Sequence, residues 1–303
     1  MTGATGLVGS TLLRRLLAEG TQVRCLVRDP RRLGTQRVRV QIALGDLTDP
    51  PSFRNALRGV DTVVHLAAAI RDQPQGSIEE LDGIATWRMV EAAERQGVER
   101  FVFFSALGAS THNRTRMLRA KAVAEQAVVE ADLHSIVFAP SIVYAPGDPW
   151  LTLLERLALL PVMPVSGRGE ARFQPIWAED VAECVLAGLR DGVEGPALTA
   201  AGTNGDRRHR RYELAGPETL SHSEIVRAVL GALGRSRPLL HVPTPIVSRA
   251  LRLLEAATGE RAFATWDEAE LMEVSMVSER GSSDVRALGV TPQRLSAVLD
   301  AAA

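Results

Sequence analysis

The chain has 303 residues, with 35 lysines and arginines against 36 aspartates and glutamates, so its formal net charge is −1. Its apolar share of 46% is typical of a folded protein with a sizeable core and excludes a disordered chain. The balanced charge argues against a protein-wide footprint for nucleic acid or an anionic membrane, so we expect no nucleic-acid partner. The two cysteines, Cys25 and Cys184, are too few for a disulfide framework and favour a reducing, cytoplasmic location.

Membrane spans are not expected, because a spanning helix needs about 18 consecutive apolar residues. The longest apolar candidates are Val63–Ile70 and Leu157–Val165. The first has the length of a strand, and the second is interrupted by prolines.

Short apolar runs alternate with amphipathic stretches through the first half of the chain. The expected helices and strands, in chain order, are the helix Leu7–Ala18, the strands Thr21–Val27 and Val38–Leu44, the helix Ser52–Leu57, the strand Thr62–Ala68, the helix Ile84–Gln96, the strand Phe101–Ser105, the helix Arg116–Ala131 and the strand Ser135–Ala139. Continuous apolar strands that alternate with helices indicate a parallel sheet covered on both faces. The sequence therefore predicts a doubly wound α/β fold of the Rossmann type.

The pattern changes after Pro146-Gly147. Further elements are expected as helices at Trp150–Leu160, Ala178–Leu189, Glu224–Leu233 and Pro245–Ala257, with a strand at Tyr212–Leu214. We predict a main domain of residues 1–148 to which 174–200 and 211–217 return. Residues 149–173 and 218–303 are expected to form a smaller C-terminal lobe for a substrate or partner.

A glycine-rich turn opens the chain. Gly3, Gly6 and Gly9 stand at the spacing G-x-x-G-x-x-G, directly before the first expected helix. The first glycine permits a tight turn, the second lets the backbone approach a pyrophosphate, and the third allows close helix packing. The diphosphate would sit at the helix N-terminus, where unpaired N–H groups and the helix dipole favour anions. A glycine-rich helix start alone is weak evidence, but the following strand and a charged residue about twenty positions on predict a dinucleotide site.

A buried strand should precede this turn, yet the printed sequence starts at the turn itself. A doubly wound sheet without its first, central strand exposes apolar neighbours and unpaired backbone groups on both flanking strands. We therefore expect the natural start to lie several residues upstream, with a defective nucleotide site as the alternative.

Short motifs follow one another along nearly the whole chain: Thr2–Gly9, Leu26–Pro30, Gly45–Leu47, His65–Ala68, Phe103–Ser105, Ala139–Tyr144, Gln174–Trp177, Asp180–Ala182 and Tyr212–Glu218. In this order they resemble the short-chain dehydrogenase/reductase superfamily. The resemblance is greatest to its atypical, extended-like branch, which includes NmrA-like proteins and the nucleotide-binding accessory subunit of respiratory complex I. It implies an NAD(P)-binding Rossmann core. The cofactor contacts that we carry over are Gly3, Thr5, Gly6, Leu7, Val8, Arg28, Asp46, Leu47, Ala67, Ala68, Ser105, Lys121, Pro140 and Ile142.

The residue after the second strand of such a fold reads the adenosine ribose. An acidic residue there binds the 2′-hydroxyl of NAD, whereas an arginine accommodates the 2′-phosphate of NADP. Arg28 holds this position, so the sequence favours NADP(H) over NAD(H). Asp29 adjoins it and keeps NAD open. Asp46 would contact the adenine by resemblance, with a structural turn as the alternative.

The expected chemistry departs from the family. Tyrosine-dependent relatives use Tyr-x-x-x-Lys, in which the tyrosine exchanges the proton and the lysine binds the ribose. Lys121 matches the lysine, but Met117 stands four residues earlier, and a thioether cannot exchange a proton. Four residues after Tyr144 comes Asp148, and four after Tyr212 comes Gly216. Neither tyrosine fits the motif.

Weaker catalytic candidates remain in the sequence. Ser105 alone could polarise a carbonyl, and His112 with Asn113 follows in the loop expected near the nicotinamide. Arg88 falls where the family often has an active-site asparagine. His65 is interpreted as a packed histidine.

Two further features of the sequence lie outside these motifs. The sequence shows no metal-ligand spacing, so no metal is expected. The basic run Arg207–Arg211 is interpreted as a solvated loop, with an acidic partner or a phosphate contact as the alternative.

The resemblance, together with the missing tyrosine, therefore implies a cofactor-sensing or accessory NAD(P)H-binding protein of the atypical short-chain type. The alternative is an NADPH-dependent oxidoreductase that acts on a small substrate with a non-tyrosine proton donor. An epimerase- or dehydratase-like enzyme of nucleotide sugars is weaker, because fold-level analogy alone supports it.

Overall fold

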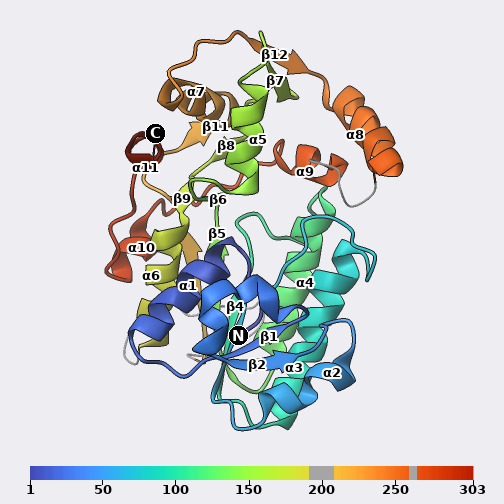
Figure 1. Cartoon of the computed structure of the whole chain (residues 1–303), viewed down its shortest axis with the longest axis vertical. Coiled ribbons are helices and arrows are strands. Elements are labelled where there is room, and N and C mark those ends of the chain that lie inside the picture. The colour runs from blue at the N-terminus through green and yellow to red at the C-terminus, as the bar shows by residue number, and fades with distance from the viewer. Residues whose placement is uncertain (191–207, 259–264, 303) are drawn as a thin grey trace.

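The computed structural model describes residues 1–190, 208–258 and 265–302 (Figure 1). The sheet with its helices forms the lower part of the molecule in Figure 1, and most of the C-terminal elements lie above it. The α/β architecture and the parallel sheet confirm the predicted Rossmann-type fold class.

The sheet part consists of parallel strands. These are β1 (Arg24–Val27), β2 (Gln41–Leu44), β3 (Thr62–His65), β4 (Arg100–Phe104), β5 (His134–Pro140) and β10 (His209–Leu214). Strands β10, β5, β4 and β3 are hydrogen bonded in that order, and β1 pairs with β2 in a separate sheet.

Helices alternate with these strands. They are α1 (Leu7–Ala18), α2 (Pro50–Arg54), α3 (Ala85–Arg95), α4 (Arg116–Glu130) and α6 (Ala178–Leu189), with 3-10 segments η1 (Pro30–Val38) and η2 (Asn55–Leu57) and a π-helical turn, η3 (Glu79–Ile84). Gly20, just beyond the end of α1, lies in the left-handed region at φ +76°, as is common after a helix.

Met1 and Thr2 connect the two sheets at one point. The Met1 carbonyl accepts a hydrogen bond from the Leu26 N–H (2.9 Å), and the Thr2 N–H donates to the Val64 carbonyl (2.9 Å). Beyond this point a cavity of about 490 Å³ lies between β1 and β3, lined among others by Val23, Val63 and Phe53. Polar side chains, among them Arg24, Asp61 and Arg100, line the rest of this cavity.

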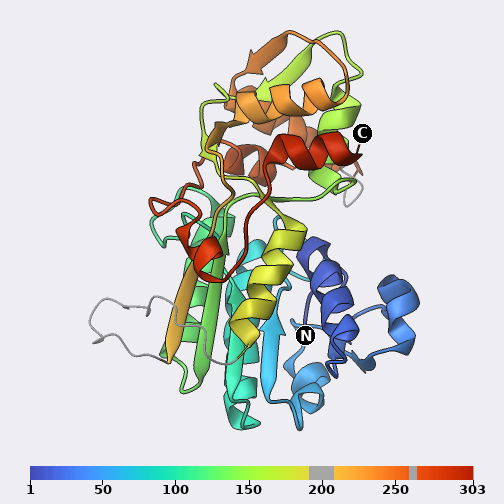
Figure 2. The same cartoon turned by 90° about the vertical axis from the view of Figure 1, so that its left-hand side faces the viewer.

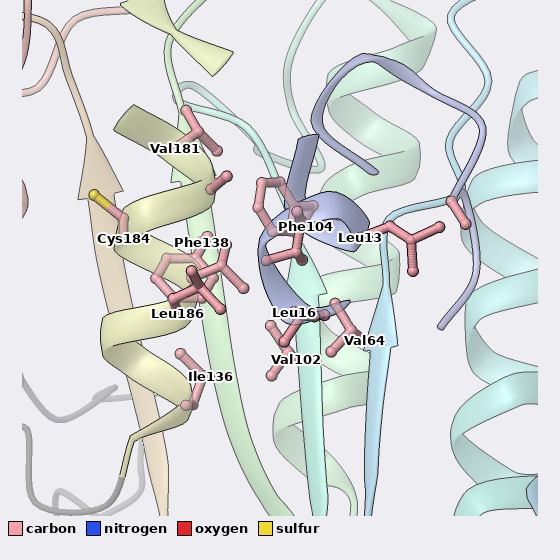
Figure 3. Close-up of a cluster of buried hydrophobic side chains, with 14 of the residues drawn as sticks. Leu13, Leu16, Val64, Val102, Phe104, Ile136, Phe138, Val181, Cys184 and Leu186 are labelled. Atoms are coloured by element: carbon pink, nitrogen blue, oxygen red, sulfur yellow. The ribbon is translucent and has the colours of Figure 1, made fainter. Parts of the chain in front are cut away.

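Helices α1 and α6 cover one face of the sheet together (Figure 2). Figure 3 shows Leu13 and Leu16 of α1 and Val181 and Leu186 of α6 gathered over apolar side chains of the strands. The Arg15 guanidinium of α1 also donates to two carboxylates of α6, at 2.7 Å to Glu179 and at 2.8 Å to Glu183. This packing fixes the helix whose N-terminus follows the glycine-rich turn.

The remaining elements surround a second core. Strands pair as β6 (Val143–Tyr144) with β9 (Ile176–Trp177), β7 (Met163–Ser166) with β12 (Leu239–Val242), and β8 (Arg172–Phe173) with β11 (Leu220–Ser221). The helices are α5 (Pro149–Leu157), α7 (His222–Ala232), α8 (Thr244–Thr258), α9 (Trp266–Leu271), α10 (Ser283–Ala287) and α11 (Leu295–Ala302). Leu154 of α5, Val226 of α7 and Leu299 of α11 meet in this core.

One C-terminal segment returns to the sheet. Val285 of α10, Leu288 and Val290 join the core under α1 and α6, and Asp284 accepts the N–H of Glu213 in β10 at 2.8 Å. The two-lobe division of the sequence stays a prediction, and residues 191–200 of that division lie outside the described residues.

Element boundaries differ from the sequence expectations by a few residues. At Val38–Leu44, for example, the strand begins only at Gln41 because η1 extends to Val38. Short strands such as β7, β8 and β12 were not predicted, because runs of two to four residues carry little periodicity.

The basic run was predicted as a loop, and this was wrong for its last three residues. His209, Arg210 and Arg211 form the start of β10 beside β5. The Arg211 guanidinium is paired with Glu125 (2.9 Å) and Glu213 (2.7 Å), so intramolecular carboxylates satisfy its charge. Arg207 lies outside the described residues.

Candidate dinucleotide site

The glycine-rich turn is built at minimal spacing. Gly3 has φ +66°, and a Cβ there would lie 2.6 Å from the backbone of Leu66 and Ala67. A Cβ on Gly9 would lie 2.0 Å from the Gly3 carbonyl oxygen, so the helix packs directly on the turn. Two of the three glycines are therefore required by geometry. A Cβ on Gly6 would meet only the Gly3 carbonyl, at 3.4 Å.

Gly6 is the N-cap of α1, and the Ser10 N–H bonds back to its carbonyl at 2.9 Å. The N–H groups before Ser10 in the first turn have no acceptor within the helix, because helical hydrogen bonds reach back four residues. The first turn carries no acidic side chain. This end of α1 can therefore accept an anionic group, and Thr5, Leu7 and Val8 lie beside it in the chain.

The ends of β1 and β2 carry the predicted ribose and adenine contacts. Arg28 follows β1, is exposed, and donates from Nη1 to the Gln73 amide oxygen at 3.3 Å. The Asp29 carboxylate accepts the Arg31 N–H at 2.9 Å and caps η1. The Asp29 carboxylate is thus used in the cap, and the Arg28 side chain is exposed.

Asp46 forms a local turn after β2. Its Oδ1 accepts from the N–H (2.9 Å) and hydroxyl (2.8 Å) of Thr48. Leu47 beside it packs against the core under α3. The turn that the sequence left open as an alternative role of Asp46 is thus present.

Thr2 and His65 join the turn to the end of β3. The Ala67 N–H donates to Thr2 Oγ1 (3.3 Å), which is also hydrogen bonded to His65 Nδ1 (3.0 Å). His65 Nε2 contacts Thr86 Oγ1 at 3.1 Å. Burial, with a smaller contribution from the charge of Lys121, lowers the pKa of His65 to about 3. The histidine is therefore neutral and structural, as its packed position predicted.

Lys121 lies on α4 and is almost completely buried, with 4% of its side chain exposed. Its Nζ lies 3.7 Å from Asp82 Oδ1 and 5.2 Å from the centre of the Phe103 ring. Asp82 belongs to η3, and its Oδ1 accepts the Ala69 N–H at 2.9 Å. Burial raises the pKa of the Asp82 carboxyl, and the charge of Lys121 opposes this shift.

Arg116 holds the Asp82 turn against α4. Its guanidinium donates to both carboxylate oxygens of Glu79, at 2.9 and 2.7 Å, and to those of Asp72, at 3.0 and 2.9 Å. The hydrogen bond with Arg116 lowers the pKa of Glu79 to about 2. The first turn of α4 is thereby tied to the turn that carries Asp82.

Sequence reasoning missed Asp82. Arg88, which was considered for the asparagine position, instead donates to the Thr48 carbonyl at 3.4 Å. The residue that lies beside Lys121 is Asp82, six positions before Arg88. Glu79, Glu80 and Asp82 form one acidic stretch, and the sequence alone does not say which of them turns inward.

Ser105 directly follows β4, and its N–H donates to the Phe138 carbonyl at 2.8 Å. Its buried Oγ has no hydrogen-bond partner among the described residues. Pro140 ends β5 and is buried, and Ile142 follows it, half-buried against the second core. All three lie at carboxyl ends of parallel strands, where ligands of open α/β sheets bind.

His112 is exposed in the loop before α4, with its Nδ1 3.2 Å from Thr111 Oγ1. The Asn113 side chain is used locally, because its Oδ1 accepts the Thr115 N–H at 3.0 Å. Local hydrogen bonds thus involve both His112 and Asn113, the side chains that the sequence suggested as donors near the nicotinamide.

The position one helical turn before Lys121 belongs to Met117, which packs against the second core. Both tyrosines are completely buried elsewhere. Tyr144 belongs to the second core, and Tyr212 stacks on Phe138 with ring centres 5.6 Å apart. Burial raises the pKa of the hydroxyl of both Tyr144 and Tyr212, which opposes proton transfer from either.

The residues fit a dinucleotide at three points. The turn is packed so closely that Gly3 and Gly9 leave no room for a Cβ, the start of α1 favours an anion, and the far end offers buried polar atoms. Within the described ranges, no group of three or more His, Cys, Asp and Glu residues is arranged to hold a metal ion.

Residues 3–150 match a family model described as NAD(P)H-binding. With the fold and the turn described above, this identifies that part of the chain as an NAD(P)H-binding Rossmann domain. The chain is similar in sequence to subunit 9 of the NADH dehydrogenase (ubiquinone) 1 alpha subcomplex and shares its fold with a nucleoside-diphosphate-sugar epimerase.

The similarity to the mitochondrial subunit 9 of Arabidopsis thaliana is 28% identity over 255 residues, which covers 80% of this chain and 60% of the plant protein. The chain thus spans less than two thirds of that relative. Ceramide reductase of Caulobacter vibrioides is 29% identical over 258 residues, covering 84% of this chain and 77% of that protein. The photosystem II assembly factor Ycf39 of Cyanophora paradoxa is 31% identical over 137 residues, covering 45% and 42%.

Solved structures share the fold. A nucleoside-diphosphate-sugar epimerase of Staphylococcus aureus superposes with a TM-score of 0.77 at 19% identity, covering 99% of this chain and 98% of that chain. UDP-glucose 4-epimerase of Thermus thermophilus, solved with NAD, gives 0.71 at 20% identity, covering 99% and 95%. In the described part of the chain, no helix is long and apolar enough to cross a membrane.

Proposed function

We propose that this protein binds NADPH in preference to NADH and acts as a cofactor-sensing or accessory protein. The observation that carries this proposal is Met117, which stands one turn before Lys121 where tyrosine-dependent relatives have their proton donor. A thioether has no proton to exchange, whereas the phosphate-binding turn is complete. Binding is thus preserved where the usual chemistry is lost.

The proposed cofactor contacts run along the carboxyl ends of the strands. The first turn of α1 would receive the diphosphate, Arg28 the 2′-phosphate, and Lys121 the nicotinamide ribose. Ala67, Ala68, Pro140 and Ile142 would line the cofactor between these points. A bound nicotinamide supplies a hydride, and this chain's residues supply binding and orientation.

Single-turnover measurements test the accessory role. The protein is loaded with NADPH and mixed with a panel of aldehydes, ketones and quinones, and the nicotinamide absorbance is followed. We expect no oxidation above the rate of free NADPH. Steady consumption with any member of the panel would contradict a non-enzymatic role.

An NADPH-dependent oxidoreductase is the second candidate. Two observations favour it: the buried, unpartnered Ser105 hydroxyl among the described residues, and the similarity to a ceramide reductase over 84% of this chain. If this candidate is correct, Ser105→Ala abolishes substrate-dependent oxidation but leaves NADPH binding intact. An active Ser105→Ala variant would exclude the serine as the polarising group.

The epimerase-like alternative gains no support beyond fold, since the matching solved epimerases are at most 20% identical in the two cases above. A cytoplasmic location remains a prediction from the two free, buried cysteines, Cys25 and Cys184. A protein partner is part of the accessory role, as the similarity to a complex I subunit and an assembly factor suggests.

A further inference from the structure

Helix α8 has an outward side that is apolar. The helix lies at the outer edge of the upper part of the molecule in Figure 1, and it packs against α9. Ser248 is buried and Val247 is half-buried, so both belong to the packed side. Ile246 and Leu253 lie on the other side, two helical turns apart, and are 57% and 74% exposed. Exposed Ala250 lies between them. The solvent side of a helix normally carries polar residues, so these three residues, the α8 face, depart from that pattern.

The segments next to α8 also expose large apolar side chains. Strand β12 leads directly into the helix, and its Leu240 is exposed. Strand β7 pairs with β12, and the residues that precede β7 in the chain are exposed as well: Leu159, Leu160 and Val162. Single exposed apolar residues are ordinary on a protein surface, but a set of them on adjoining segments indicates an interaction site.

The charge around the α8 face is of one sign. Residues 233–253 contain four arginines and neither aspartate nor glutamate, although the whole chain has a net charge of −1. Arg249 is exposed and stands about one helical turn from both Ile246 and Leu253, so it borders the α8 face. Exposed Arg252 lies next to it on the same side of the helix. The segment therefore combines an apolar face with a positively charged border.

We propose that the α8 face binds the surface of an anionic phospholipid membrane. The helix lies parallel to the membrane, Ile246 and Leu253 enter the boundary between headgroups and acyl chains, and Arg249 pairs with headgroup phosphates. Such binding needs no membrane-spanning helix, because it depends on buried apolar surface and on attraction between opposite charges. It is independent of the proposed NAD(P)H binding, whose contacts lie at the carboxyl ends of the strands.

A second copy of the chain is a less suitable partner. In a symmetric dimer the same surface faces itself, so Arg249 would approach its own counterpart. Residues 233–253 supply no carboxylate that would offset this repulsion. A phospholipid surface instead presents phosphates, which guanidinium groups bind through paired hydrogen bonds. The charge of the segment thus favours a lipid surface over self-association.

Co-sedimentation of the whole chain with lipid vesicles tests the proposal. Wild-type protein is mixed with vesicles of equimolar phosphatidylglycerol and phosphatidylcholine, and with vesicles of phosphatidylcholine alone. We expect about tenfold stronger binding to the mixed vesicles than to phosphatidylcholine, because only the mixed vesicles carry net negative charge. This binding should weaken about tenfold when sodium chloride is raised from about 0.1 M to about 0.5 M, since salt screens the attraction.

Two variants test the residues that carry the proposal. Arg249→Glu reverses a charge at the border, and Leu253→Ser removes an apolar side chain from the α8 face. We expect each to weaken binding to the mixed vesicles about tenfold. The matched controls lie in the sheet part: Arg54→Glu changes an exposed arginine of α2, and Val38→Ser changes an exposed valine of η1. Both controls should bind like the wild-type protein.

Thermal unfolding establishes that the variants are folded, and the wild-type titration at two salt concentrations decides the question if one is not. Absence of binding to the mixed vesicles would overturn the proposal, and so would equal binding of either variant and its control. Sedimentation equilibrium without vesicles tests the other occupant. A wild-type dimer that Leu253→Ser converts to a monomer, without vesicle binding, would assign the α8 face to a second copy. Each of these results leaves the proposed function intact, because calorimetric titration with NADPH measures cofactor binding separately.

Discussion

The phosphate end and the ribose end of the candidate site differ in how completely the protein itself satisfies them. At the phosphate end, Gly3 and Gly9 leave backbone contacts so close that no side chain fits. At the ribose end, Asp82 and Ser105 keep buried oxygens without partners among the described residues. The first end is shaped by steric exclusion and the second by unsatisfied polar groups. The two ends of the candidate site are therefore built in different ways, one by close backbone packing and the other by buried polar side chains.

The largest expected effect is at the phosphate end. Gly9→Ala places a Cβ 2.0 Å from the Gly3 carbonyl oxygen, so the turn and α1 must separate. We expect a loss of about 3 kcal/mol in the free energy of unfolding, from overpacking, and loss of measurable NADPH binding. Denaturant unfolding and calorimetric titration measure the two effects.

The matched control is Gly231→Ala in α7, where a Cβ would meet nothing within 4 Å. Alanine has the higher helix propensity, so this variant should gain up to about 1 kcal/mol of stability. If Gly9→Ala and Gly231→Ala had the same stability and the same NADPH affinity, the steric explanation of the turn would be wrong.

A second effect concerns His65, which links Thr2 of the turn to Thr86 of α3. Its pKa of about 3 lies below the unfolded value, so the unfolded state takes up a proton first as the pH falls. The stabilising contribution is therefore present above about pH 6.5 and is lost progressively toward pH 3. At pH 5 we expect this residue to lower the free energy of unfolding by about 2 kcal/mol relative to neutral pH.

Unfolding of wild-type protein and of His65→Gln at pH 7 and pH 5 checks this. The variant should lose less stability between the two pH values. His222→Gln is the comparison in the second core, because burial also lowers the pKa of His222, to about 4. If His65→Gln kept the full pH dependence, the neutral, structural role of His65 would be wrong.

A smaller effect is expected at Arg28. Arg28→Ala should raise Kd for NADPH about tenfold and leave Kd for NADH within about twofold, because the guanidinium would pair only with the 2′-phosphate. Arg95→Ala is the control, since Arg95 is an exposed arginine at the C-terminal end of α3 and is paired with Glu91. Equal loss for both dinucleotides in Arg28→Ala would show that Arg28 does not distinguish them.

The smallest effect is expected at Met117. Met117→Leu conserves the volume that packs against the second core, so we expect NADPH affinity within about twofold and stability within about 1 kcal/mol of wild type. Affinity is measured by titration and stability by thermal unfolding. A larger loss of affinity would assign the thioether a direct role at the ribose end.

The sequence predicted the elements with strong periodicity and missed those determined by tertiary contacts. The alternation of apolar strands and helices was sufficient for the parallel sheet and for α1 to α4. The Gly3 and Gly9 contacts followed from spacing, because a known turn geometry requires glycine there. Asp82 could not be chosen in advance, since its inward position depends on the π-helical turn that Arg116 fixes through Glu79. The strand formed by His209–Arg211 was missed for a similar reason, because one of the carboxylates that pair with Arg211 belongs to Glu125, which is distant in sequence.

Calorimetric titration of the wild-type protein with NADPH and with NADH tests the central claim most directly. The complete turn and Arg28 predict that both dinucleotides bind and that NADPH binds more tightly. Absence of binding heat for both at millimolar concentration would contradict the account, and tighter binding of NADH would contradict its cofactor preference.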